Sequence, residues 1–214
     1  MTYVAWAVLY EGETDAAYYN VLIPRLMEDL VVAGTKLPTI PTAPAIRLKR
    51  AGASEVAEEA CAARDSFLLV FIHADTGGRH IARGLAQRAT AYCDEMRQRC
   101  GWSSDRCIVI TPKHETEAWV LADPVAVTAT LGYTGTASSI GLPTTAGQAE
   151  RLVDPKSTLK QAVAQVRGRR RPVELSQVFP AIALRQDLAT LRGLASFRRF
   201  EDSVRTALDD LGCL

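Results

Sequence analysis

Short runs of apolar residues alternate with longer amphipathic stretches over the first part of the chain. The uninterrupted runs predict strands that are buried on both faces. These strands are expected at residues 3–10, 45–49, 67–74 and 107–111. The stretches between them carry apolar residues at helical spacing, as Tyr18, Leu22, Leu26 and Leu30 do. Alternating strands and helices are typical of βαβ units, so we expect an α/β fold with a mostly parallel central sheet flanked by helices.

The pattern changes after about residue 131. Residues 132–153 are rich in Gly, Ser and Thr, which predicts a flexible loop. Helical patterns then return, and Asp154 and Pro155 are suited to be the N-cap and the first residue of a helix. We therefore expect three parts: an α/β domain at residues 1–131, the loop, and a basic helical extension at residues 154–214 that packs on the same domain.

Composition places limits on the class of protein. With 48% hydrophobic residues, the chain can bury a substantial core. No apolar run approaches the roughly 20 residues needed to cross a membrane, so no membrane partner is expected. The five cysteines form no CxxC pair, and no basic leader precedes the first strand. Reduced, buried thiols and a cytoplasmic location are therefore expected.

Charge is distributed unevenly along the chain. The formal net charge is +1, but residues 1–150 carry −4 and residues 151–214 carry +5. Arginine supplies 20 of the 25 basic residues; its guanidinium suits phosphate, although a GC-rich genome would also favour it. The basic run at residues 167–171 is either a solvated loop or a surface that follows the backbone of DNA or RNA. In the second case the contacts would come from Arg167, Arg169, Arg170, Arg171, Arg198 and Arg199.

Carboxylates follow three of the predicted strands. Glu11 and Asp15 follow the first strand, Asp75 follows the third, and Glu115 and Glu117 follow the last. The ends of parallel strands meet at one edge of a sheet. Carboxylates gathered there repel one another unless a cation joins them, and hard oxygen ligands suit Mg²⁺ or Mn²⁺. One interpretation is therefore a metal site that holds a phosphate; the other is that each acid only caps a turn or a helix.

Five motifs carry a resemblance to a known family. They are YEGETD at residues 10–15, FIHADTGG at 71–78, HETEAWVLAD at 114–123, DPKSTLK at 154–160 and LASFRRFEDSVRTAL at 194–208. In order and spacing they resemble an uncharacterised bacterial TOPRIM-like family, a domain of unknown function. That family is related to the nuclease half of the overcoming-lysogenisation-defect nucleases and is often encoded beside AAA or ABC-type ATPases. The similarity spans nearly the whole chain and implies a TOPRIM-like, Rossmann-like sheet.

The resemblance also implies roles for individual residues. Glu11 would be a metal ligand and a general acid or base, and Asp15 would face the same metal. Asp75 matches the second acid of the family's Asp-x-Asp motif, but His73 stands where the first acid belongs. Imidazole ligates Mn²⁺, so His73 belongs to the expected ligand set. Glu115 or Glu117 could restore the missing carboxylate, and Lys156 would stabilise charge on a transferring phosphate.

The expected function is metal-dependent phosphodiester hydrolysis of DNA or RNA. The resemblance supplies the choice of a nuclease and the phage-defence or mobile-element setting with a partner ATPase. Replacement of an acid by His73 supports an alternative, a catalytically degenerate subunit that binds and regulates an ATPase. A small-molecule phosphate hydrolase is a weaker reading because it leaves the basic C-terminal third unexplained. The chain has no GxxxxGK[ST] loop, so ATP hydrolysis by that route is not expected.

Overall fold

The central sheet has four parallel strands. A computed structural model describes residues 2–32, 34, 36–75, 89–168 and 173–214. In it the strands are β1 (Trp6–Leu9), β2 (Ile46–Arg47), β3 (Leu69–His73) and β4 (Cys107–Ile110), in the order β2-β1-β3-β4. Each pair of neighbouring strands is parallel. The prediction of an α/β fold with a mostly parallel sheet flanked by helices is confirmed.

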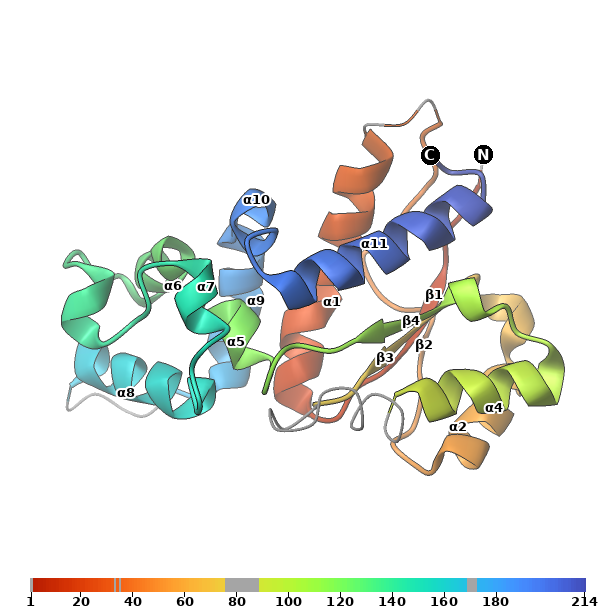
Figure 1. The fold of residues 1–214 in the computed structure, drawn as a ribbon, viewed down its shortest axis with the longest axis horizontal. Coiled ribbons are helices and arrows are strands. Elements are labelled where there is room, and N and C mark those ends of the chain that lie inside the picture. Colours follow the sequence, from red (N-terminus) through yellow and green to blue (C-terminus); the bar gives the residue numbers. More distant parts are fainter. Residues whose placement is uncertain (1, 33, 35, 76–88, 169–172) are drawn as a thin grey trace.

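Helices cover both faces of this sheet because its side chains alternate between two apolar cores. Trp6 and Val8 of β1 point into the larger core, while Ala7 and Leu9 point into the smaller one. Helices α1 (Glu13–Val32) and α11 (Ala195–Asp210) pack on the first side, and α2 (Ala53–Ala62) and α4 (Thr90–Cys100) pack on the second (Figure 1). Residues 76–88, in the stretch between β3 and α4, lie outside the described residues.

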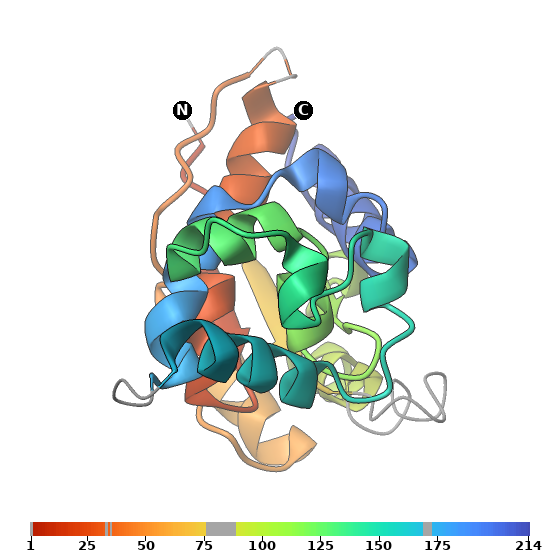
Figure 2. The same cartoon turned by 90° about the vertical axis from the view of Figure 1, so that its left-hand side faces the viewer.

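The remaining helices form a compact group beside the sheet (Figures 1 and 2). They are α5 (Glu117–Val120), α6 (Pro124–Leu131), α7 (Ala146–Ala149), α8 (Pro155–Arg167), α9 (Leu175–Arg185) and α10 (Leu188–Leu191), with a short 3₁₀ helix at Ala137–Ile140. Two other short 3₁₀ helices, Arg64–Ser66 and Ser104–Arg106, lie in the segments that lead into β3 and β4. Helix α9 packs along α1, so this group shares the larger core with the sheet.

The segment 132–153 is not the irregular loop that its composition predicts. It contains the 3₁₀ helix Ala137–Ile140 and helix α7. Ile140, Leu142 and Ala149 are buried in the larger core. Each helix is only four residues long, too short to show a periodic pattern, and such helices depend on tertiary packing rather than on intrinsic propensity.

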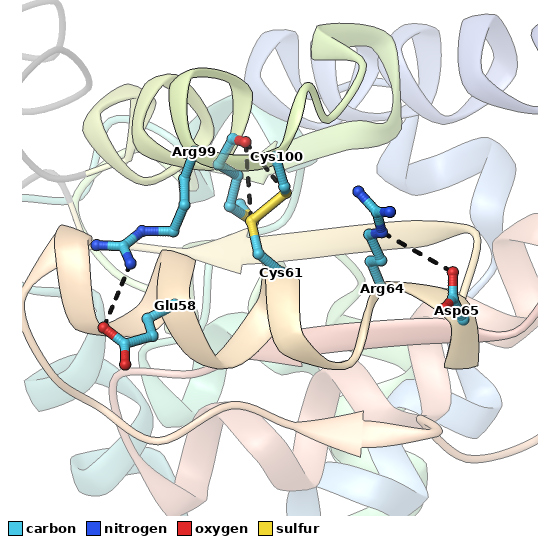
Figure 3. Close-up of a disulfide and its surroundings, with 7 residues drawn as sticks. Glu58, Cys61, Arg64, Asp65, Arg99 and Cys100 are labelled. Atoms are coloured by element: carbon cyan, nitrogen blue, oxygen red, sulfur yellow. Dashed lines mark hydrogen bonds and ion pairs between the residues drawn. A yellow bond between two sulfur atoms is a disulfide. The ribbon is translucent and has the colours of Figure 1, made fainter.

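Four of the five cysteines are paired, contrary to the expectation of reduced thiols. One disulfide joins Cys61 of α2 to Cys100 of α4, and the second joins Cys93 of α4 to Cys107 of β4. Figure 3 shows the first pair between the two helices. Cys213 is free and buried. Spacing along the chain did not reveal these pairs because the fold brings together cysteines 39 and 14 residues apart.

The paired cysteines remove one of the two sequence arguments for a cytoplasmic location. Within the described residues, no helix combines the length and the apolar character needed to cross a membrane.

Candidate functional site

A cleft opens at the edge of the sheet where the strands end. Strands β1 and β3 end at Leu9 and His73, which lie at nearly the same level in the sheet register. Glu11 and Asp75 follow two residues later in each case. The cleft has a volume of about 510 Å³, and its lining includes Glu11, Arg50, His73 and Tyr92. The parallel arrangement therefore delivers polar side chains from three strand ends to one hollow.

Glu11 and Asp75 are in direct contact. Oε2 of Glu11 accepts a hydrogen bond from the backbone N–H of Asp75 at 3.1 Å. The Glu11 carboxylate thereby ties the chain that leaves β1 to the chain that leaves β3. The structure thus brings together the two acids that the sequence placed after the first and third strands.

His73 lies between two aspartates. Its side chain is fully buried, with Nε2 3.4 Å from Oδ1 of Asp75 and Nδ1 3.8 Å from Oδ2 of Asp15. Burial disfavours the charged imidazole, but the hydrogen bond to Asp75 and the charges of Asp15, Asp75 and Glu11 outweigh that effect. The pKa of His73 is therefore raised above its ordinary value, and when protonated the ring offsets part of the negative charge of the cluster.

Thr116 and Tyr19 form the wall behind this cluster. Oγ1 of Thr116 donates a hydrogen bond to Oδ1 of Asp15 at 2.6 Å and lies 3.2 Å from Nε2 of His73. The ring of Tyr19 lies 4.9 Å from the ring of His73, centre to centre. Burial raises the pKa of Tyr19 well above its usual value, so its hydroxyl stays protonated. Sequence analysis missed both residues because Tyr19 lies within α1 and Thr116, although it stands between Glu115 and Glu117, carries no charge.

Glu115, Glu117 and Lys156 form a second group next to the first. Glu117 is the first residue of α5 and only 3% exposed, and burial raises its pKa to about 7. Nζ of Lys156 lies 3.8 Å from Oε1 of Glu117. Burial is also the main cause of a raised pKa at Glu115, whose carboxylate accepts the backbone N–H of Lys156. The charge of Asp75 acts on Glu115 and that of Asp15 acts on Glu117, so the two groups are electrostatic neighbours.

Local structure explains how Lys156 reaches these acids. Asp154 caps α8 by accepting the backbone N–H of Ser157 at 2.7 Å, and Pro155 is the first residue of the helix. This confirms the predicted start of the helix. On the other side, His114 has a φ of 72°. A non-glycine residue rarely adopts this left-handed conformation, and it reverses the chain just before Glu115.

The predicted arginines that the structure describes do not line the cleft. Arg167 ends α8, and its eleven-residue separation from Lys156 corresponds to about 16 Å along a helix axis. Arg198 and Arg199 lie exposed on α11, where Arg198 donates to the backbone oxygen of Arg192 at 2.8 Å. Residues 169–171 lie outside the described part of the chain. The basic side chain that lines the cleft is instead Arg50, which sequence analysis did not single out.

The donor atoms suit a divalent cation in kind. Carboxylates from Glu11, Asp15 and Asp75 are hard ligands of the type that Mg²⁺ and Mn²⁺ prefer. Oε2 of Glu115 and Nδ1 of His73 are buried and form no hydrogen bond within the described part of the chain. In the arrangement shown, however, the acids pair with His73, Thr116 and a backbone N–H. Across the described ranges, no three His, Cys, Asp or Glu side chains are grouped so as to hold a metal.

The fold and the cleft define a Rossmann-like α/β protein with an acidic site at the carboxyl edge of its sheet. Residues 10–205 match the model of the family described as Domain of unknown function (DUF4276), and the chain belongs to that family. No curated protein matches the chain. No solved structure matches it either. The family description names no activity, so the argument for function depends on the site.

Proposed function

We propose that this protein is a metal-dependent phosphodiester hydrolase that cleaves DNA or RNA. The observation that carries the proposal is the contact of Glu11, which lines the open cleft at the ends of β1 and β3, with the backbone N–H of Asp75. The resemblance to TOPRIM-like nucleases, stated above on five motifs, supports the same chemistry and a partner AAA or ABC-type ATPase.

The proposed hydrolysis assigns a separate role to each group of residues at the site. Glu11, Asp15 and Asp75 would hold Mg²⁺ or Mn²⁺, which when bound activates water and offsets charge on the phosphate. Lys156, about half exposed beside the buried Glu117, would contact a phosphate oxygen. Glu117 holds a proton close to neutral pH because burial raises its pKa to about 7, which suits transfer of a proton to a leaving oxygen.

One observation favours the second candidate function, a catalytically degenerate subunit that regulates an ATPase. His73 lies between Asp15 and Asp75, and although burial opposes it, the nearby carboxylates raise the pKa of His73, which favours a protonated ring that would offset their charge. In that case the cluster is held by His73 instead of a metal, and the fold serves only to bind its partner.

Cleavage assays with matched variants test the proposal. The purified chain would be incubated with DNA and RNA in Mg²⁺ or Mn²⁺, with and without an ATPase encoded nearby. Glu11→Gln keeps the side-chain shape and removes the charge, so we expect a loss greater than the roughly 10–100-fold that follows removal of an outer-shell partner. Glu13→Gln is the control, because Glu13 lies two residues away, is exposed and pairs only with Arg47 among the described ion pairs.

The two functions give different results in these assays. Under the hydrolase proposal, wild type and Glu13→Gln cleave in at least one metal and Glu11→Gln does not. Absence of cleavage by wild type in every condition, together with retained ATPase binding by Glu11→Gln, would establish the regulatory subunit instead.

A further inference from the structure

The segment that follows β2 brings two basic side chains to the edge of the sheet that carries Glu11 and Asp75. Leu48 is buried, and its N–H donates to the backbone oxygen of Val8 at 2.8 Å. The backbone N–H of Lys49 donates to Oε2 of Glu59 at 2.9 Å. These two hydrogen bonds fix the backbone at Leu48 and Lys49. The side chains of Lys49 and Arg50 are exposed.

Arg50 is oriented towards the candidate site by a specific contact. Its Nη1 donates to the backbone oxygen of Glu11 at 2.9 Å. A guanidinium has five N–H donors, and this bond uses one of them. The neighbouring Arg47 differs, because Glu13 holds it in a two-pronged pair at 2.7 and 3.0 Å. Arg50 is thus the guanidinium positioned to bind a ligand beside Glu11.

The shape of the surface indicates what Arg50 would bind. Arg50 and Glu11 both line the cleft described above, and both also line an adjoining groove of about 490 Å³ with Lys49. A ligand can therefore pass Arg50 on its way from the groove into the cleft. Tyr92 lines the cleft and is held by a hydrogen bond of 3.1 Å from its hydroxyl to the backbone oxygen of Ala51.

We infer that Arg50, with Lys49, binds the phosphodiester backbone of a single nucleic-acid strand and directs it to Glu11. The cleft and the groove each have the volume of a small-ligand site, which suits the nucleotides of a single strand better than a rigid duplex. Cationic side chains along a groove and an aromatic ring close by are the usual elements of single-strand binding, and here the ring is that of Tyr92 in the adjoining cleft. The identity of the ligand rests on the proposed function, whereas the binding site rests on the contacts of Arg50.

Binding measurements test the inference separately from cleavage. A fluorescein-labelled single-stranded DNA oligonucleotide would be titrated with protein in EDTA, and anisotropy would be recorded over a range of salt concentrations. Each lost phosphate contact on a single strand lowers the slope of log affinity against log salt by about 0.7. We expect that decrease, with several-fold weaker binding, for Arg50→Gln and again for Lys49→Gln. Arg50→Lys keeps the charge, so it should recover part of the affinity. It cannot bind a phosphate through two N–H donors at once, as a guanidinium can, so the recovery should be incomplete.

Arg64→Gln is the matched control. Arg64 has the same charge but lies just before β3, at the opposite edge of the sheet, where it pairs with Asp65 (Figure 3). Its substitution should leave affinity and slope unchanged. Far-UV circular dichroism and melting curves would show that Arg50→Gln folds, as expected for an exposed side chain.

Every outcome decides the inference. No binding by wild type, an unchanged slope for Arg50→Gln, or tighter Arg50-dependent binding of duplex than of single strand would overturn it. Arg50-dependent binding without cleavage in any metal would support the inference and refute the hydrolase. Loss of cleavage in Glu11→Gln together with unchanged binding by Arg50→Gln would support the hydrolase and refute the inference about Arg50.

Discussion

His73 sits in the middle of the acidic cluster, with Asp15 on one side and Asp75 on the other. An acid at this position would place a third carboxylate where like charges cannot all ionise without a cation. Histidine relieves this repulsion within the protein itself. A histidine at this position leaves less negative charge for a metal than an acid would, and when protonated it stabilises the metal-free site.

Substitution of His73 by Asp should couple folding to metal. The expected result is a lower melting temperature than wild type in EDTA, because three neighbouring carboxylates repel in a buried site. Millimolar Mg²⁺ or Mn²⁺ should then raise the melting temperature, since a ligand that binds only the folded state stabilises it by RT ln(1 + [L]/Kd). Thermal unfolding followed by circular dichroism measures both effects.

His73→Gln separates charge from packing in this experiment. It removes the imidazolium but adds no carboxylate, so it should destabilise the protein and respond to metal less than His73→Asp. Equal melting temperatures for His73→Asp with and without metal would contradict a cation site at this edge.

At the scale of elements, the sequence predicted what depends on local pattern. Strands β1 and β3 were predicted because each is an apolar run buried on both faces, and their common direction placed Glu11 beside Asp75. Arg50 was missed because β2 is only two residues long and carries no strong pattern. Thr116 was missed because tertiary contacts, with Asp15 and His73, give it its place.

The disulfides, which also depend on tertiary contacts that a local pattern does not reveal, fix the position of α4. This helix begins after the undescribed segment that follows Asp75, and it carries Tyr92 to the cleft. Its Cys93 is tied to β4 and its Cys100 to α2. No local pattern identifies such partners, because the pairing depends on how α2, α4 and β4 pack.

Reduction should therefore loosen the face of the sheet that α2 and α4 cover. Loops of 14 and 39 residues correspond to about 3–4 kcal/mol each in the chain-entropy account of disulfides. We expect a phosphine reductant to lower the melting temperature. A Cys61→Ser, Cys100→Ser variant, which lacks one of the two disulfides, should show about half of that decrease under oxidising conditions. Thiol titration of the unreduced, unfolded protein should find one free thiol, that of Cys213. Five free thiols with an unchanged melting curve would contradict the pairing.

At the scale of the molecule, the sheet and the C-terminal helices share one core. Trp119 packs against Phe197 and Phe200 of α11, with ring centres 5.2 and 5.5 Å away. Gln186, at the end of α9, accepts the hydroxyl of Tyr18 in α1 at 2.6 Å and donates to the backbone oxygen of Trp119 at 2.8 Å. Because residues distant in the sequence enclose α1, the segment 154–214 forms part of the core and is required for the fold.

Removal of that segment should prevent folding of the remainder. A chain ending at residue 153 would lose α9 and α11, which cover α1 and one face of the sheet. Exposed apolar surface costs about 25 cal/mol per Å², and loss of large aromatic side chains from a core costs several kcal/mol each, a large part of the total stability of a domain. We expect the fragment to show little fixed tertiary structure by near-UV circular dichroism and to aggregate. The full chain should unfold in one transition that coincides for tryptophan fluorescence and far-UV circular dichroism. A soluble fragment with native near-UV signal, or two separate transitions in the full chain, would show that the α/β part folds alone.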